Sequence, residues 1–239
     1  MYLPTKMMTE SAELRIEFVR DEDVSTSIDI IVRAFAAFPF EQALGNTDDE
    51  ESRKAAQQRH LRAWNEHFED TGIWPAIRCV HADSGTGKET TVACAEWYIY
   101  PKPIPRNDLR GPSYLLSGVW LPDEQREKIQ RTFRPPLDLR AQWTAGRAHG
   151  LLIFMATDPA WRRRGAATMC VQWGIDKCKE LGIPAYLEAS KEGAPVYQRL
   201  GFEVLEGVHM ELDGKSFDFP ALMWWPPGTR DEDKRKLAG

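Results

Sequence analysis

The hydrophobic pattern along the chain is clearest between residues 151 and 182. A continuous apolar run at Leu151–Met155 predicts a strand buried on both faces, and Asp158 and Pro159 end it. Apolar residues then recur at spacings of three and four, which predicts an amphipathic helix that ends at Gly182. The apolar face of this helix consists of Ala167, Cys170, Val171, Gly174, Ile175, Cys178 and Leu181.

The N-terminal part of the chain predicts one strand followed by two helices. Alternating residues at Leu14–Val19 indicate the strand. Apolar residues at helical spacing in Ile28–Phe38 indicate the first helix. The second helix is expected at Thr47–Asp70, where Thr47 and Glu50 have the spacing of a capping box.

A hairpin is expected before the insert in the middle of the chain. Ile77–Ala82 and Thr90–Tyr100 have the composition of strands. The turn-forming residues Asp83–Lys88 connect them.

Residues 101–150 form an insert that is too long for a simple loop and must have structure of its own. Pro122–Phe133 is expected to be a helix that the pair Pro135-Pro136 ends, and Leu137–Thr144 is expected to be a second, short helix. The insert is interpreted as a lid over a site, with a packing appendage or a homodimer contact as alternatives.

The C-terminal part of the chain predicts further strands around one short helix, Ala194–Leu200. Residues 229–239 are a mixed-charge tail that is expected to be disordered. The whole pattern indicates a single α/β domain over residues 1–239. The expected strands are Ile183–Glu188, Phe202–Leu205, Val208–Asp213 and Ala221–Trp225.

Candidate chemistry lies at the turn between the central strand and its helix. A helix N-terminus presents unpaired N–H groups and a positive dipole end, and small residues at 165–167 let a ligand approach that backbone. Arg162, Arg163 and Arg164 add positive charge, which together favours a phosphate or pyrophosphate. The alternative is an ordinary turn with solvated arginines.

The motif Arg162-x-x-Gly165-x-Ala167, preceded by Thr157-x-Pro159, resembles the signature of the GNAT superfamily of acyl-CoA-dependent N-acetyltransferases. The resemblance implies a GNAT-like α/β fold with a mixed, mostly antiparallel central sheet flanked by helices. Its central strand would splay from its neighbour and bind coenzyme A. The cofactor-binding residues would be Phe154, Met155, Ala156, Thr157, Arg162, Arg163, Arg164, Gly165, Ala166, Ala167 and Thr168.

Two residues of the turn depart from the family pattern. Arg163 stands where a glycine is usual, and Ala167 stands at the commoner second glycine. Cofactor affinity would suffer if Ala167 needed a positive φ.

A second signature follows at Leu187-Glu-Ala-Ser190 and Gly193-x-Pro195-x-Tyr197, completed by Gly201-Phe202. It resembles a branch of the superfamily that is common in fungi. The resemblance implies that Tyr197 gives a proton or a hydrogen bond to the leaving thiolate, and that Ser190 lies near the pantetheine or the tyrosine. Core packing is the alternative for Tyr197.

Glu96 interrupts an otherwise apolar strand, so it is either a general base in a cleft or an exposed or structural carboxylate. Phe35, Phe38 and Trp120 are candidates for the acceptor site, with core packing as the alternative.

The charge and the spacing of cysteine and histidine residues exclude some classes of ligand. The net charge of −5 argues against a nucleic-acid backbone as the main ligand. The four cysteines lack metal spacing, and His60 and His67 lack a third ligand, so no metal is expected and both histidines are expected at the surface or the core edge. Without a signal pattern or a membrane-length apolar run, a cytoplasmic or nucleocytoplasmic protein is expected.

These observations predict an enzyme that moves an acetyl group from acetyl-CoA to a primary amine of a small molecule by direct transfer in a ternary complex. A polyamine, an amino sugar, an amino acid or a xenobiotic would be such an acceptor. The alternatives are a lysine or N-terminal acetyltransferase of proteins, an inactive CoA-binding sensor, and a structural protein with a coincidental basic turn.

Overall fold

The computed structural model describes residues 14–35, 49–104, 121–212 and 214–235. Within them, seven strands form one sheet with the order β1-β2-β3-β4-β5-β7-β6. All neighbouring strands are antiparallel except β4 and β5, which are parallel. The predicted mixed, mostly antiparallel sheet is therefore confirmed. The strands are β1 Leu14–Phe18, β2 Ala76–Ala82, β3 Glu89–Tyr100, β4 His149–Thr157, β5 Ala185–Glu188, β6 Glu203–Leu212 and β7 Lys215–Trp224.

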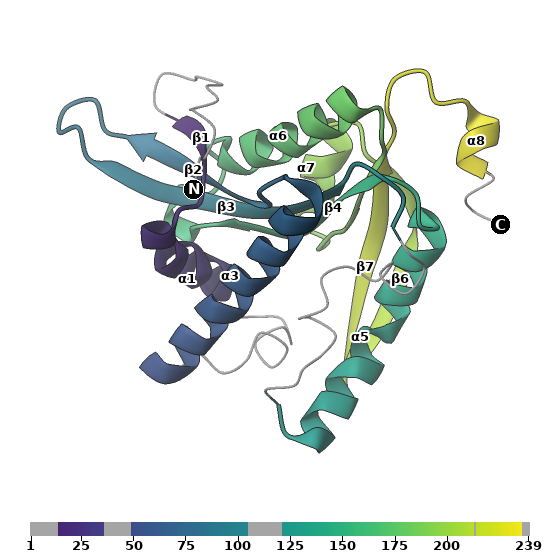
Figure 1. Cartoon of the computed structure of the whole chain (residues 1–239), viewed down its shortest axis with the longest axis horizontal. Helices are drawn as coiled ribbons and strands as arrows, with labels where there is room; N and C mark the ends of the chain where they lie inside the picture. Colours follow the sequence, from purple (N-terminus) through teal and green to yellow (C-terminus); the bar gives the residue numbers. More distant parts are fainter. Residues whose placement is uncertain (1–13, 36–48, 105–120, 213, 236–239) are drawn as a thin grey trace.

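Helices cover both faces of this sheet (Figure 1). Helices α6 and α7 pack on one face, while α1, α3 and α5 pack on the other. The helical segments are η1 Asp21–Asp23, α1 Val24–Phe35, α3 Glu50–Thr71, α5 Asp123–Thr144, η3 Pro159–Trp161, α6 Ala166–Leu181, α7 Ala194–Arg199 and α8 Asp231–Arg235.

The predicted strand–turn–helix unit is present as β4, η3 and α6. A Cβ atom on Gly174 would lie 2.0 Å from the Trp97 ring, so the glycine allows the helix to lie this close to the sheet. The indole N–H of Trp97 donates to the carbonyl of Cys170 at 3.1 Å. Most of the predicted apolar face is buried, but Leu181 is 42% exposed, because it is the last residue of α6.

Helix α5 corrects the prediction for the insert. It runs from Asp123 to Thr144 through Pro135 and Pro136, which were expected to end it. Each proline removes one i→i−4 hydrogen bond, but its fixed φ is compatible with a helix. Buried residues in both halves, among them Ile129 and Leu137, hold the helix together by packing, and α5 lies along β6 (Figure 1).

Two smaller corrections concern the ends of elements. Helix α3 begins at Glu50 with Asp49 as its N-cap, whose carboxylate accepts from the Ser52 amide at 2.8 Å, and Thr47 lies outside the described residues. Phe202–Leu205 and Val208–Asp213 were expected as two strands, but β6 is continuous from Glu203 because β7 pairs along its length.

The tail that was expected to be disordered contains α8. Lys234 of this helix pairs with Glu203 at 2.7 Å, and its ammonium lies 5.9 Å from the centre of the Trp225 ring. These contacts explain why the segment is ordered at Asp231–Arg235.

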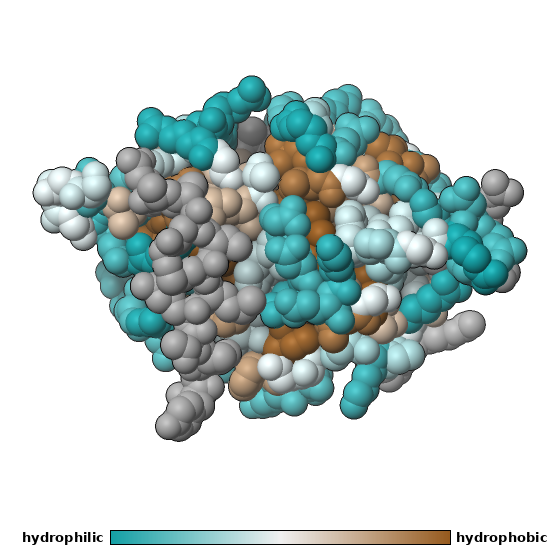
Figure 2. Space-filling model, turned by 90° about the horizontal axis from the view of Figure 1, so that it is seen from above, coloured by the Kyte–Doolittle hydropathy of each residue, from teal (hydrophilic) through white to brown (hydrophobic). Residues whose placement is uncertain are grey.

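The surface of the molecule is mixed. Viewed from above, hydrophilic residues cover most of the face, and hydrophobic residues show in limited patches between them (Figure 2). Among the described helices, none combines the length and the apolar composition that crossing a bilayer would require.

Candidate functional site

The gap in the sheet between β4 and β5 defines the site. The two strands pair only at Gly150–Leu152 with Ala185–Leu187. Beyond this point β4 continues to Thr157 beside β3, and the register shift opposite Glu96 leaves Ile153 as an extra, bulged residue in β4. In the described sheet, the edge of β4 that faces β5 therefore has no strand partner after Leu152, as expected of a splayed central strand.

A cavity of about 880 Å³ occupies this gap. That volume is within the range of about 300–1,000 Å³ that is common for ligand sites. We distinguish two ends. The turn end comprises residues 161–163 and 165–168 with Ser190 and Tyr197. The α5 end comprises Phe35, Phe133, Leu137, Arg140, Glu188, Met210 and Phe219.

The backbone at the turn end has the conformation that an anion site needs. Gly165 is the N-cap of α6 with φ 90°, and it provides no side-chain cap. The first amides of α6 therefore keep their N–H groups available, and Gly165, Ala166, Ala167 and Thr168 all line the cavity.

The two departures from the family pattern have different outcomes. Ala167 lies inside α6 and does not have a positive φ, so its side chain causes no backbone strain that would weaken cofactor binding. Arg163 does have a positive φ, 66°, which is the conformation that a glycine would adopt without strain.

The three arginines of the turn do not take equivalent positions. Arg162 and Arg163 line the cavity, whereas the guanidinium of Arg164 lies over the Trp161 ring at 4.7 Å from its centre. Trp161 also lines the cavity and packs against His81 with ring centres 4.4 Å apart. Trp161 was not predicted as a site residue, although an aromatic residue directly before the basic run was a usable signal.

The predicted residues of β4 divide between the cavity and the core. Phe154, Met155 and Thr157 line the cavity. Ala156 does not, because its methyl group is buried in the core on the α1 and α3 side of the sheet.

Tyr197 and Ser190 lie together on the wall of the cavity. Tyr197 is 8% exposed and packs edge-on against Phe202 at 5.9 Å between ring centres. Burial raises the pKa of Tyr197 above its usual value, with a smaller contribution from the Cys170 thiol. The phenol is therefore fully protonated at neutral pH. The hydroxyl of Ser190 accepts from the Gly193 amide at 3.0 Å and orders the start of α7.

Glu96 is buried but does not line the cavity. Its carboxylate lies 2.7 Å from Nδ1 of His60 and accepts from the Tyr98 hydroxyl at 3.2 Å. His60 in turn packs against Phe154, which separates this pair from the cavity wall. Of the two interpretations of Glu96, the geometry supports the structural one.

The two histidines of α3 are not at the surface, which corrects that prediction. His60 and His67 are 2% and 5% exposed. Nε2 of His67 accepts from the Ile99 amide at 3.2 Å, and its ring packs edge-on against Tyr98. Burial lowers the pKa of His67 to about 4, so its ring is neutral at pH 7. We refer to His60, His67, Glu96 and Tyr98 as the α3 cluster.

Of the predicted acceptor-site residues, only Phe35 lies in the described part of the chain. It lines the cavity and packs edge-on against Phe154, with ring centres 5.8 Å apart. Phe38 and Trp120 are outside the described residues.

The α5 end of the cavity contains an ion pair that was not predicted. The guanidinium of Arg140 donates to both oxygens of Glu188, at 3.1 and 2.7 Å. Their side chains are 8% and 16% exposed. A charged residue closing the apolar strand β5 was a signal for Glu188, but nothing local in the sequence indicated that Arg140 would reach it.

The cysteines do not provide a nucleophile. All four are free and buried, as expected. Burial raises the pKa of Cys79 and of Cys178 to about 12, so both are neutral thiols at pH 7. Within the described ranges, no group of three or more His, Cys, Asp or Glu side chains is placed to hold a metal ion.

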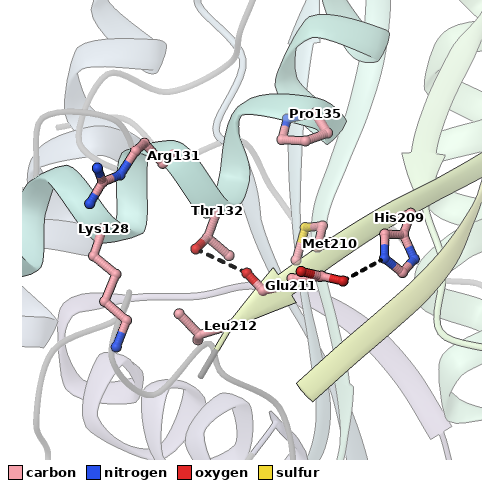
Figure 3. A pocket seen from close by; sticks show the side chains of 8 residues that line it. All are labelled: Lys128, Arg131, Thr132, Pro135, His209, Met210, Glu211 and Leu212. Carbon is pink, nitrogen blue, oxygen red and sulfur yellow. Dashed lines mark hydrogen bonds and ion pairs between the residues drawn. The ribbon is translucent and has the colours of Figure 1, made fainter. Parts of the chain in front are cut away.

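A smaller pocket of about 470 Å³ lies between α5 and β6 (Figure 3). Two of its side chains bind Glu211: Thr132 donates to the Glu211 carbonyl at 3.4 Å, and Nε2 of His209 lies 3.5 Å from the Glu211 carboxylate. Nδ1 of His209 also lies 2.9 Å from Asp218, which is outside the lining. The hydrogen bond to Asp218 raises the pKa of His209. The groups that the turn and the splayed strand offer to an anion are absent from its lining.

Comparison with known proteins points to one family. Residues 131–202 match the model of the acetyltransferase (GNAT) family. A probable acyltransferase, SID5 of Ajellomyces capsulatus, is 29% identical over 120 residues, which are 47% of this chain and 80% of that protein.

Two solved structures share the fold. One comes from Corynebacterium glutamicum and is described as "histone acetyltransferase HPA2 and related acetyltransferase". It is 23% identical with a TM-score of 0.51, and the match covers 92% of this chain and 99% of that one. The other is yncA of Salmonella typhimurium, solved with its cofactor acetyl-CoA, with 13% identity, a TM-score of 0.52, and coverage of 91% and 96%. At these identities the likeness concerns the fold alone.

Proposed function

Because the chain contains a GNAT acetyltransferase domain, we propose that it transfers an acetyl group from acetyl-CoA to a primary amine of a small molecule. One observation carries the proposal. The gap between β4 and β5 leads to the uncapped N-terminus of α6, with Tyr197 on the wall of the same turn end of the cavity.

The residues of the turn end fit the coenzyme. The amides of residues 165–168 and the guanidinium groups of Arg162 and Arg163 bind the diphosphate, since both supply positive potential to one point of the wall. The unpaired edge of β4 after Leu152 offers backbone hydrogen bonds to the amide-containing pantetheine arm.

Acetyl-CoA, when bound, supplies a thioester whose acetyl group passes to the amine with release of a free thiol. Tyr197 holds a proton at its hydroxyl oxygen and donates a hydrogen bond to the leaving sulfur. Because its pKa lies above that of an ordinary thiol, about 8.5, donating a hydrogen bond is favoured over complete proton transfer. The buried, neutral cysteines support direct transfer without an acyl-enzyme.

Binding is tested first, by calorimetric titration of the purified chain. Acetyl-CoA should bind, and acetyl-pantetheine, which lacks the diphosphate, should bind about 100-fold more weakly, because charge-assisted hydrogen bonds contribute about 1.5–3 kcal/mol each. Arg162→Gln should weaken acetyl-CoA several-fold, whereas Arg62→Gln, an exposed arginine of α3 outside the cavity wall, should not. No heat with millimolar acetyl-CoA would refute the proposal.

Turnover is tested next, by free-thiol release with a panel of amines. Release with a free small amine supports the proposed reaction. Release only with lysine-containing peptides would indicate a protein acetyltransferase. Binding of acetyl-CoA with no release on any acceptor would indicate a sensor.

A further inference from the structure

The α5 end of the cavity differs in chemistry from the turn end. Five elements contribute to it. Besides Arg140 of α5 and Glu188 of β5, the side chains that they bring are apolar: Phe35 from α1, Phe133 and Leu137 from α5, Met210 from β6 and Phe219 from β7. The other charged side chains of the wall, Arg162, Arg163, Glu192 and Arg199, come from the turn and from the segment around α7.

Within this apolar surrounding, Arg140 and Glu188 form the polar feature. Burial alone lowers the pKa of Arg140, but the charge of Glu188 and the hydrogen bonds to it raise that pKa above its usual value, so the guanidinium remains charged. Each carboxylate oxygen of Glu188 accepts one bond from Arg140. The hydroxyl of Tyr186 also interacts with this carboxylate, but it has no hydrogen-bond partner of ordinary geometry among the described residues, so each oxygen of Glu188 has a second lone pair to offer. Glu188 can therefore accept an N–H group of a ligand while Arg140 holds it in place.

We propose that the α5 end is the acceptor subsite, and that it selects a primary amine carried on an apolar body, an alkylamine or arylalkylamine, whose N–H groups bind Glu188. This inference rests on the proposed acetyl transfer and specifies its acceptor. Arg140 is a positioning residue, because it acts by orienting the carboxylate.

The free energy of burying the acceptor favours an apolar amine over a more polar one. An amino sugar or a polyamine would place several hydroxyl or ammonium groups against Phe133, Leu137 and Phe219, and each buried polar group without a partner costs about 1–3 kcal/mol. An apolar body instead gains about 25 cal/mol for each Å² that it buries. An amino acid would bring a carboxylate close to Glu188, which already occupies the guanidinium of Arg140.

Four acceptors test the inference, each assayed by thiol release at saturating acetyl-CoA: phenethylamine, phenylalanine, glucosamine and spermidine. Phenethylamine should have the highest kcat/KM, by about 100-fold over the others, which corresponds to about 2.7 kcal/mol. Phenylalanine differs from it only in the carboxylate, so a preference for phenylalanine would overturn the inference and assign Arg140 to carboxylate binding.

Substitutions in the cavity wall test whether the α5 end determines the KM for the acceptor. Glu188→Gln should raise the KM for phenethylamine about tenfold and leave the KM for acetyl-CoA unchanged. Glu206→Gln is the matched control, because Glu206 also lies beside α5, where it accepts from Trp143 at 2.8 Å, but does not line the cavity. Phe219→Leu should raise the same KM, and Phe217→Leu, its stacked neighbour on β7 outside the wall, should not.

The outcomes distinguish this inference from the proposed function. Binding of acetyl-CoA with a preference for glucosamine or spermidine, or with no turnover of phenethylamine, would overturn the acceptor assignment and leave the coenzyme site standing. Absence of acetyl-CoA binding would overturn both. The ranking of the four acceptors uses the unmodified chain, so a variant that fails to fold does not remove the test.

Discussion

Two glutamates in strands of the same sheet, Glu96 in β3 and Glu188 in β5, have opposite relations to the cavity. Glu96 is 1% exposed, and the α3 cluster occupies both of its oxygens. Glu188 lies on the wall of the cavity, with Arg140 behind it. A carboxylate in an apolar strand can thus be a structural acceptor or a ligand contact, and its neighbours in space decide which.

The cause of the difference is the opening of the sheet. β3 pairs with β4 on both sides of Glu96, apart from the bulge at Ile153, and the Glu96 side chain lies on the face of the sheet that α3 covers. β5 pairs with β4 at three positions only, and Glu188 lies just past the last of them, where the strands separate. The end of strand pairing therefore exposes Glu188 to the cavity.

The strongest test of this comparison is Glu96→Ala. Removing the carboxylate leaves His60 and Tyr98 without their buried partner, so the free energy of unfolding should fall by about 3–5 kcal/mol and the melting temperature by about 10 °C. Activity per folded molecule should stay unchanged, measured below the transition. A normal melting curve with loss of turnover would instead make Glu96 the general base, and Glu96→Gln should recover part of the stability.

Acid should destabilise the α3 cluster through His67. The folded pKa of about 4 lies below the ordinary value of 6.5, so only the unfolded chain takes up a proton between these values. The stabilisation is complete above pH 6.5 and is lost as the pH falls toward 4, by about 1.4 kcal/mol per pH unit. The test is the variant His67→Gln, which keeps an acceptor for the Ile99 amide. Its melting temperature should fall less than that of the unmodified chain between pH 7 and pH 5.

Equal acid sensitivity of the variant and the unmodified chain would contradict the assignment to His67. Burial also lowers the pKa of His149 to about 4, so that residue accounts for acid sensitivity that the variant retains.

Tyr197→Phe and Tyr98→Phe should separate the cavity from the α3 cluster. Loss of the Tyr197 hydroxyl should lower kcat about 50-fold and leave acetyl-CoA affinity unchanged, because the hydrogen bond acts on the leaving sulfur. Loss of the Tyr98 hydroxyl should reduce stability without affecting kcat. Steady-state kinetics and melting curves measure both, and unaltered turnover in the first variant would remove Tyr197 from the mechanism.

The smallest expected effect concerns the turn end. Arg163→Gly relieves the positive φ and should raise stability by about 1 kcal/mol, while losing a cation should weaken acetyl-CoA several-fold. Arg162 has φ −60°, so Arg162→Gly should weaken the coenzyme without the gain in stability. Thermal melting without ligand and calorimetric titration check the two effects, and equal melting temperatures would show that Arg163 is not strained.

The sequence was most informative where structure depends on nearby residues. The unit from β4 through the turn to α6 was predicted in order. The hairpin at Asp83–Lys88 is confirmed by two backbone hydrogen bonds: the Asp83 amide donates to the Lys88 carbonyl, and the Gly87 amide donates to the Asp83 carbonyl. Predictions failed where packing outweighed local preference, as in α5, which continues through Pro135 and Pro136 because both of its halves contribute buried residues.

By itself, the sequence determined the strand–turn–helix unit and the uncapped, arginine-rich start of α6. Helix and turn hydrogen bonds join residues three or four positions apart, so local pattern contains the necessary information. Only the tertiary structure decided which glutamate faces the cavity and that Arg140 holds it. That pair joins residues 48 positions apart, and its contact depends on where β4 and β5 stop pairing and on how α5 packs against β6.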